Sequence, residues 1–508
     1  MILKIDAADN VGVSVSNLVS GISCAVKGTD NNEQIRVIND VPKGHKVALF
    51  DIPEGSEIIK YGCRIGSAVS YISAGSHVHT HNMISELTGK TEYSRIRTRP
   101  SENIENNNKD LNEISEEVYI NGYRRPNGKT GIRNEIWIIP TVGCINGTVR
   151  NLEKAANVKF GSIKGIDGVH SFEHPYGCSQ LGDDLSNTRE ILKGLILHPN
   201  AGGVLVTGLG CENNRLDELR QSLGDYDSER ILFMECQSVE DETETGLQLI
   251  GKLIETVCGD KRVPVPFSEL TIGLKCGGSD AFSGITANPL LGVLTDRIVS
   301  LGAGVVMAEV PEMFGAEQLL MDRSYDETTF GSIVDMINFY KDYFLSHGEN
   351  LYDNPSPGNR EGGITTLEEK SLGCVKKSGA APVVSVIKYG GQVVSRGLNL
   401  LYSPGNDLVS STALASAGAQ IICFTTGRGT PYGAPVPTVK ISSNSELAEK
   451  KSSWIDFDAG NLVNDGDYSG SAKLLLNMLK DIASGTKITK NEIYDHRDIA
   501  IFKNGITL

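Results

Sequence analysis

Residues 170–179 read HSFEHPYGCS and hold two histidines, a glutamate and a cysteine within ten positions. Imidazole and thiolate groups bind divalent transition metals, and histidine also transfers protons near neutral pH. Because Pro175 fixes its backbone angle and Gly177 permits unusual angles, we expect a tight turn between them. We interpret the stretch as functional, with His174 as an acid–base group or metal ligand and Cys178 as a metal ligand. The alternative is a turn whose side chains are purely structural.

A second histidine group lies near the N-terminus, in the stretch SAGSHVHTHNM. His77, His79 and His81 alternate with other residues, and a strand would place all three on one face. They are three of only nine histidines in the chain. The spacing therefore predicts a divalent-metal site or a set of acid–base and anion-binding groups. The alternative is a partly exposed edge strand that happens to be rich in histidine.

Further reactive residues follow apolar stretches that we predict to be parallel strands. Ligands bind outside the carboxyl ends of such strands. Cys144 follows IIPTVG, Cys211 follows VLVTGLG, Cys276 follows LTIGLK, Glu309 ends VVMAE, and Arg428 follows CFTTG. A lone cysteine is more often a buried apolar side chain, whereas a carboxylate at a strand end must be paired or solvated. We therefore consider Glu309 the strongest candidate of this set.

Composition limits the class of protein. The chain has 508 residues, 39% of them hydrophobic, and a net charge of −15, which argues against nucleic acid or an anionic membrane as the main partner. The start of the chain lacks the pattern of a signal peptide, and no apolar run approaches the roughly 20 residues that span a bilayer. We expect a cytoplasmic protein. Its ten cysteines include no C-x-x-C pair and should be reduced.

Hydrophobic patterning divides the chain into four parts. Short strand-like runs separated by turns predict a small all-β domain over residues 1–90. A polar segment rich in Asn and Glu, residues 91–118, reads as a linker. Apolar runs then alternate with helical patterns, which indicates α/β domains with mainly parallel strands over 119–262 and 263–508.

Six blocks carry a resemblance to a known family. They read GYRRPNGKTGIRNEIWIIPTVGC, HPYGCSQLGDD, HPNAGGVLVTGLGCE, LKCGGSDAFSGITANPLLG, AEVPEMFGAE and TTGRGTPYGAPVPTVKIS. Together they resemble the altronate/galactarate dehydratase family of sugar-acid hydro-lyases, and GSHVHTHN resembles the end of its small SAF (β-clip) domain. The resemblance implies a SAF domain followed by a Rossmann-like α/β catalytic region. It also implies loss of water from a sugar acid, with D-altronate as the expected substrate and galactarate or a sulfolactate-type compound as alternatives.

The implied reaction removes a proton alpha to a carboxylate and expels the 3-hydroxyl as water. A metal, Fe2+ or alternatively Mn2+, and nearby cations would stabilise the dianion, and a general acid would protonate the leaving group. The candidates for acid–base catalysis are His174, His77, His79 and Glu309. The candidates for substrate binding are Arg428, Thr430, Ser279, Asn288 and His81. The candidate metal ligands are His174, Cys178, Cys144 and Cys276.

Two other functions remain open from the residues alone. Cys144, Cys178, Cys211 and Cys276 could hold an iron–sulfur cluster, although their spacing is not that of common cluster motifs. A sugar-acid binding or regulatory protein that uses the β domain as a sensor is the non-enzymatic alternative. For the enzyme, the expected partners are a small anionic sugar acid and further copies of the chain, a homodimer being favoured.

Overall fold

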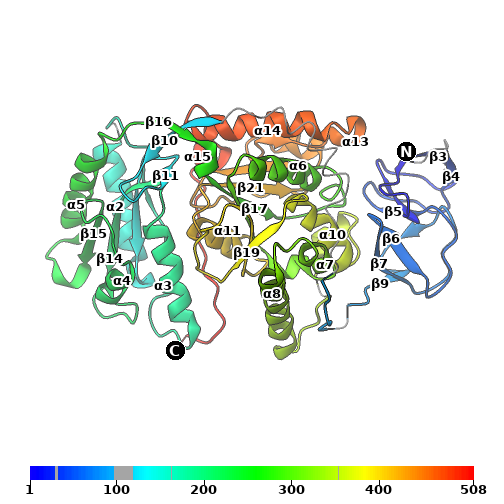
Figure 1. The fold of residues 1–508 in the computed structure, drawn as a ribbon, viewed down its shortest axis with the longest axis horizontal. Coiled ribbons are helices and arrows are strands. Elements are labelled where there is room, and N and C mark those ends of the chain that lie inside the picture. The colour runs from blue at the N-terminus through cyan, green and yellow to red at the C-terminus, as the bar shows by residue number, and fades with distance from the viewer. Residues whose placement is uncertain (29–32, 88, 96–117, 162, 353, 508) are drawn as a thin grey trace.

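The computed structural model describes residues 1–28, 33–87, 89–95, 118–161, 163–352 and 354–507. Three regions follow one another across the molecule (Figure 1). An N-terminal β region and an α/β region built on residues 135–257 lie at opposite ends, on either side of a larger α/β region. Of the predicted linker, residues 96–117 lie outside the described residues. Residues 91–95, the first part of the predicted linker, pack on the larger region, where the Tyr93 hydroxyl donates to Glu317 over 2.5 Å.

The N-terminal region contains strands and no helix in its described residues, as predicted. One sheet has the order β4-β3-β1-β2-β5-β8 and the other β6-β7-β9. Alternating burial along β3 shows one face on the core and one in solvent. The strands are β1 Ile2–Leu3, β2 Val11–Ser14, β3 Ser23–Lys27, β4 Gln34–Arg36, β5 Lys46–Ala48, β6 Glu57–Lys60, β7 Cys63–Ala68, β8 His77–Val78 and β9 Met83–Ile84.

The α/β region at the other end has a four-stranded sheet of order β13-β12-β14-β15. Every strand pair in it is parallel. All residues of the central strand β14 are buried, as expected where helices cover both faces. Its elements are β12 Glu135–Pro140, α2 Asn146–Phe160, β13 Val169–Ser171, α3 Asp183–Ile196, β14 Ala201–Gly208, α4 Leu216–Ser222, β15 Ile231–Glu235 and α5 Glu242–Val257.

The central region has a seven-stranded sheet of order β19-β20-β18-β17-β21-β22-β23, again with parallel pairs throughout. The prediction of α/β regions with mainly parallel strands is therefore confirmed. Its strands are β17 Thr271–Cys276, β18 Gly304–Met307, β19 Val383–Ile387, β20 Gly397–Leu401, β21 Ile421–Thr426, β22 Thr438–Ser442 and β23 Phe457–Asp458. Its main helices are α6 Ala287–Ser300, α7 Glu317–Met321, α8 Glu327–Ser346, α10 Leu367–Val375, α11 Asp407–Ser416 and α14 Tyr468–Ala483.

Two connections join the α/β regions. A small antiparallel sheet pairs β10, Tyr119–Arg124, with β11, Thr130–Gly131, and β16, Val263–Pro266. After α15, Lys490–Ile493, the C-terminal segment returns to the four-stranded region, where Arg497 pairs with Glu135 over 2.8 Å. Among the described residues, no helix has the length and apolar character needed to cross a membrane.

Candidate functional site

Charged and sulfur-bearing side chains meet at the carboxyl ends of the central strands β17 and β18. Lys275 and Cys276 end β17, and Glu309 follows β18. Parallel neighbours end at the same edge, so the sheet itself brings these side chains together. Glu312 follows Glu309 in the same turn, and helix α10 and the residues after it supply the remaining partners. We call the set the charged cluster: Lys275, Cys276, Glu309, Glu312, Lys370, Cys374 and Lys377, all of them buried.

Glu309 occupies the centre of the charged cluster. Its backbone is left-handed, with φ 72° and ψ 60°, a conformation that costs energy for any residue with a side chain and often marks functional positions. Its carboxylate contacts the Lys275 ammonium, accepts from the Cys276 N–H over 3.0 Å, and lies 3.3 Å from Lys377 Nζ. Burial raises its pKa to about 7, while the two lysines act in the opposite direction. A carboxyl group with this pKa is suited to proton transfer near neutral pH.

Two thiols and a second carboxylate complete the charged cluster. Ligand atoms of Cys276, Glu312 and Cys374 lie within 4.8 Å of one another. A hydrogen bond with Cys374, together with the charge of Lys377, lowers the pKa of Cys276 to about 6. Burial alone would raise the pKa of Glu312, but Lys370, whose Nζ lies 2.9 Å away, and the neighbouring lysines lower it to about 2. The cluster therefore holds charges of both signs in a buried setting.

Two predicted substrate-binding residues form part of the wall of this cluster. Ser279 Oγ lies 2.8 Å from Cys276 Sγ. Asn288, at the start of α6, accepts from the Thr425 hydroxyl over 2.6 Å and donates to the Gly373 carbonyl over 3.0 Å. Both side chains are buried, and their polar atoms are used by protein groups.

The β region contributes a group of four histidines: His45, His77, His79 and His81, here called the histidine cluster. Only His77 lies in a strand, because β8 ends at Val78 and a turn follows. Ring centroids of neighbouring members are 4.8–5.6 Å apart. His45 Nδ1 lies 3.0 Å from His77 Nε2. The turn, rather than the predicted strand face, brings the rings together.

The imidazoles of His45, His77 and His79 are neutral at pH 7. Burial, and then the neighbouring histidines, lower the pKa of His77 to about 3. Burial and the charge of Lys46 lower that of His79 to about 4, and burial also lowers the pKa of His45. His81 is exposed. His45 was not predicted from the sequence, because a single histidine in the turn VPKGHK has no distinguishing pattern.

The histidine cluster lies directly against the central region. His45 Nε2 contacts the Glu361 carbonyl over 3.1 Å, and His79 Nε2 contacts that of Arg360 over 3.0 Å. Two buried lysines of the β region, Lys46 and Lys60, each pair with Glu369 of α10 over 2.7 Å. Because an unpaired buried charge is costly, these pairs hold the β region in one orientation.

A pocket with a volume of about 340 Å³ opens beside this contact. Arg428 lines it, is about half exposed, and lies 3.1 Å from a Glu361 carboxylate oxygen. Thr430 is half-buried, and its hydroxyl accepts from the Tyr432 N–H over 3.2 Å. The other charged residues that line the pocket are Lys43, Asp280, Glu446, Lys450 and Lys451. Lys43 comes from the β region, so two parts of the chain build one basic pocket.

The predicted metal ligands of the four-stranded region lie elsewhere. His174 is buried, and both of its ring nitrogens contact backbone: Nε2 lies 2.8 Å from the Pro140 carbonyl, and Nδ1 accepts from the Tyr176 N–H over 3.3 Å. Burial lowers its pKa to about 4. Cys178 is half-buried and Cys144 is exposed. With both nitrogens engaged, this imidazole has no free lone pair for a metal.

The four proposed metal ligands are thus divided between two sheets. Cys276 belongs to the central region, whereas His174, Cys178 and Cys144 follow strands of the four-stranded region. Among the described residues, no set of three close ligand atoms includes any of the last three. The four cysteines considered for an iron–sulfur cluster are divided in the same way, because Cys144, Cys178 and Cys211 follow strands of the four-stranded region and Cys276 ends β17. Sequence spacing could not reveal this, because equivalent strand ends occur in both sheets.

Comparisons with known proteins identify the family. Three family models match the chain: the altronate/galactarate dehydratase SAF domain over residues 1–86, the D-galactarate dehydratase/altronate hydrolase second domain over 122–258, and the D-galactarate/altronate dehydratase C-terminal domain over 267–507.

Full-length relatives agree with these matches. The chain is 49% identical to the altronate dehydratase of Escherichia coli and 48% identical to that of Bacillus subtilis, covering 100% of this chain and 99% of each relative. It is 32% identical to the galactarate dehydratase (L-threo-forming) of E. coli, over 98% of this chain and 96% of the relative. The resemblance noted in the sequence is therefore confirmed: the chain belongs to the altronate/galactarate dehydratase family and is a sugar-acid hydro-lyase.

Proposed function

We propose that the chain dehydrates D-altronate to a 2-keto-3-deoxy sugar acid in the basic pocket between the β region and the central region. The observation that carries this proposal is that His45 of the β region contacts the Glu361 carbonyl while Arg428, which lines the pocket, pairs with the Glu361 carboxylate. The higher identity to altronate dehydratases, 49% against 32% for the galactarate enzyme, favours altronate as the substrate.

Arg428 is our candidate for binding the substrate carboxylate. A guanidinium group binds a carboxylate through two parallel hydrogen bonds, and Arg428 already contacts the Glu361 carboxylate. The substrate would exchange for Glu361 in this contact. Lys43, Lys450 and Lys451 add positive charge around the pocket of a chain whose net charge is −15. A local positive field attracts an anionic substrate despite the negative charge of the whole.

The histidine cluster is our candidate for proton transfer at this pocket. A base must be unprotonated at working pH, and the lowered pKa values of His77 and His79 keep both rings neutral. Glu309 is the alternative base, with a pKa of about 7, but it is fully buried in the charged cluster. We assign proton abstraction to the histidine cluster and assign Glu309 the role of balancing Lys275 and Lys377.

Two sets of side chains could hold the Fe2+ or Mn2+ that the family implies. Cys276, Glu312 and Cys374 offer close donors, and Glu312 Oε2 has no hydrogen-bond partner. Three lysines already balance the negative charges there, however, and would repel a cation. His45 and His79 are neutral nitrogen donors beside the pocket, so we assign the metal to them and keep His77 for proton transfer. A metal bound there would act as a Lewis acid toward the substrate carboxylate.

The proposal is tested by assaying anaerobically prepared, Fe2+-loaded protein against a panel of aldonates and aldarates. We expect keto-acid formation to be fastest with D-altronate, and removal of the metal by a chelator to abolish it. Faster turnover of galactarate would reassign the substrate within the family. Full activity of metal-free protein would refute the metal.

A further inference from the structure

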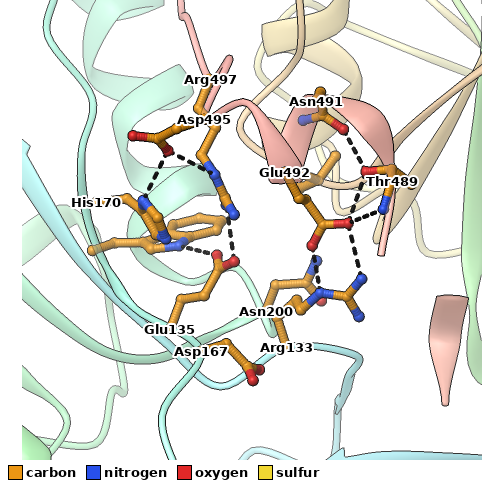
Figure 2. Close-up of polar contacts among 12 residues, drawn as sticks. Arg133, Glu135, Asp167, His170, Asn200, Thr489, Asn491, Glu492, Asp495 and Arg497 are labelled. Atoms are coloured by element: carbon orange, nitrogen blue, oxygen red, sulfur yellow. Dashed lines mark hydrogen bonds and ion pairs between the residues drawn. The ribbon is translucent and has the colours of Figure 1, made fainter. Parts of the chain in front are cut away.

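A separate group of potential metal ligands joins the four-stranded region to the C-terminal segment. His170 lies on β13, Glu153 on α2, and Asp495 just after α15. One ligand atom from each lies within 4.8 Å of the other two. His170 Nδ1 is 3.5 Å from an Asp495 carboxylate oxygen and 3.9 Å from one of Glu153. Figure 2 shows the His170 ring directed toward the Asp495 carboxylate.

The His170 ring makes no well-formed hydrogen bond, and Nδ1 has only its longer contacts with Asp495 and Glu153. Both of its nitrogens are buried and unsatisfied, although buried polar atoms normally find a partner. Nε2 packs against Gly168, where even a Cβ atom would come within 2.8 Å of it. That leaves Nδ1 as the nitrogen that faces the two carboxylates.

The donor set and its spacing match a divalent transition metal. Zinc binds imidazole nitrogen and carboxylate oxygen at about 2.0–2.2 Å, which in a tetrahedral arrangement separates donor atoms by roughly 3.4 Å. The two observed separations from Nδ1, 3.5 and 3.9 Å, are close to that value. Because the Asp495 side chain is 67% exposed, the group has access to solvent and to ions.

The surrounding charges also favour a cation. Arg497 is the nearest positive group, with Nε 3.5 Å from Asp495, and it pairs with Glu135 over 2.8 Å. Figure 2 shows this chain of contacts from Asp495 through Arg497 to Glu135. One arginine among three carboxylates, those of Glu153, Asp495 and Glu135, leaves two negative charges, which a divalent cation would balance.

We propose that Glu153, His170 and Asp495 form a second, non-catalytic site for a divalent transition metal such as Zn2+. The three ligands come from two parts of the chain that are more than 300 positions apart. A bound metal would therefore fasten the C-terminal segment to the edge strand β13. This role is independent of the pocket proposed for the substrate.

The test counts Zn2+ bound to the full-length chain after chelator treatment, by competition with a chromogenic chelator. We expect His170→Gln and Asp495→Asn each to remove one equivalent of bound Zn2+, or to lower the affinity for that equivalent by at least the roughly 10–100-fold typical of a disturbed metal site. His496→Gln, in the same segment, is the matched control and should leave every equivalent in place. Added Zn2+ should also slow hydrogen exchange of residues 489–499 in the unmutated chain and in His496→Gln, but not in His170→Gln or Asp495→Asn.

A separate variant distinguishes this site from the proposed catalytic metal. His79→Gln should remove a different equivalent and abolish turnover, whereas His170→Gln should retain the turnover of the Fe2+-loaded enzyme. The inference is overturned if both His170→Gln and Asp495→Asn bind as much Zn2+ as the unmutated chain. It is also overturned if these variants change only stability, with no dependence on Zn2+, since that result would identify an ion-pair contact.

Discussion

The two parallel sheets of this molecule have similar residues at their strand ends, but the partners that satisfy these residues differ between the sheets. In the four-stranded region, the groups at the strand ends are satisfied by local partners: His174 by backbone, and Glu212 by the Thr141 hydroxyl at 2.5 Å and by backbone N–H groups. In the central region, Lys275 and Glu309 are satisfied mainly by each other, by Lys377 just after α10, and by Asp407 of α11.

A second histidine shares the contacts of His174. His198 also precedes a proline, contacts the Ala419 carbonyl through Nε2 over 3.2 Å, and accepts the Asn200 N–H at Nδ1 over 3.1 Å. His174 makes the same pair of contacts within its own His-Pro turn. A buried neutral imidazole that uses both nitrogens in this way stabilises a turn. The comparison shows that the contacts of a residue at a strand end, rather than its residue type, indicate whether it stabilises the fold or takes part in catalysis.

The largest effect should follow from unbalancing the charged cluster. Glu309→Gln leaves Lys275 and Lys377 without their shared carboxylate in a buried site, and removing one partner of a buried pair typically costs about 3–5 kcal/mol. Chemical denaturation should show a loss of this size, accompanied by loss of turnover. Glu446→Gln, at an exposed pair with Lys43, should cost less than about 1 kcal/mol. Equal effects of the two changes would contradict the model of a strained, charge-balanced cluster.

Acid should destabilise the protein through its neutral buried histidines. The pKa of folded His174 is lowered to about 4 from an ordinary 6.5, so below pH 6.5 the unfolded chain binds a proton that the folded chain does not. Stability therefore decreases as the pH falls from 6.5 to about 4, by up to about 3 kcal/mol for this group. Between pH 6.5 and 4, the free energy of unfolding should depend less steeply on pH in His174→Gln than in the unmutated chain. An unchanged slope would mean that His174 is protonated in the folded state; His347→Gln, at an exposed histidine, is the control.

Two histidine variants should distinguish a catalytic role from a structural one. His77→Gln should lower kcat by roughly a hundredfold, the low end for losing an acid–base group, with little change in stability. His174→Gln should instead cost about 1–3 kcal/mol of stability, because backbone groups lose their partner, while turnover per folded molecule is retained. Assays at matched folded concentrations check both. The reverse pattern would return the catalytic role to the HSFEHPYGCS stretch.

The smallest predicted effect concerns substrate binding. Arg428→Lys keeps the positive charge but removes the two-pronged geometry, so we expect KM for the sugar acid to rise about tenfold with a smaller change in kcat. Steady-state kinetics with D-altronate measure this. Lys450→Arg, at another basic residue of the same pocket, should change KM less than twofold. A fall in kcat alone would show that Arg428 acts on the reacting atoms rather than on binding.

Local patterning was enough to predict much of the architecture. Alternating short apolar runs predicted the N-terminal sheets, and apolar strands separated by helical patterns predicted the parallel α/β regions. Six sequence blocks predicted the family. These inferences succeed because burial periodicity and close contact with a ligand act on neighbouring residues, which a sequence places side by side.

Which reactive residues meet was decided only by the tertiary structure. His45 joins His77 through a turn and a strand pairing, and Lys377 reaches Glu309 from 68 positions away. Cys144 follows β12 and Cys276 ends β17, two buried parallel strands that belong to different sheets. The free energy of a charge or a metal ligand depends on partners brought close by folding, over distances along the chain that no local pattern encodes.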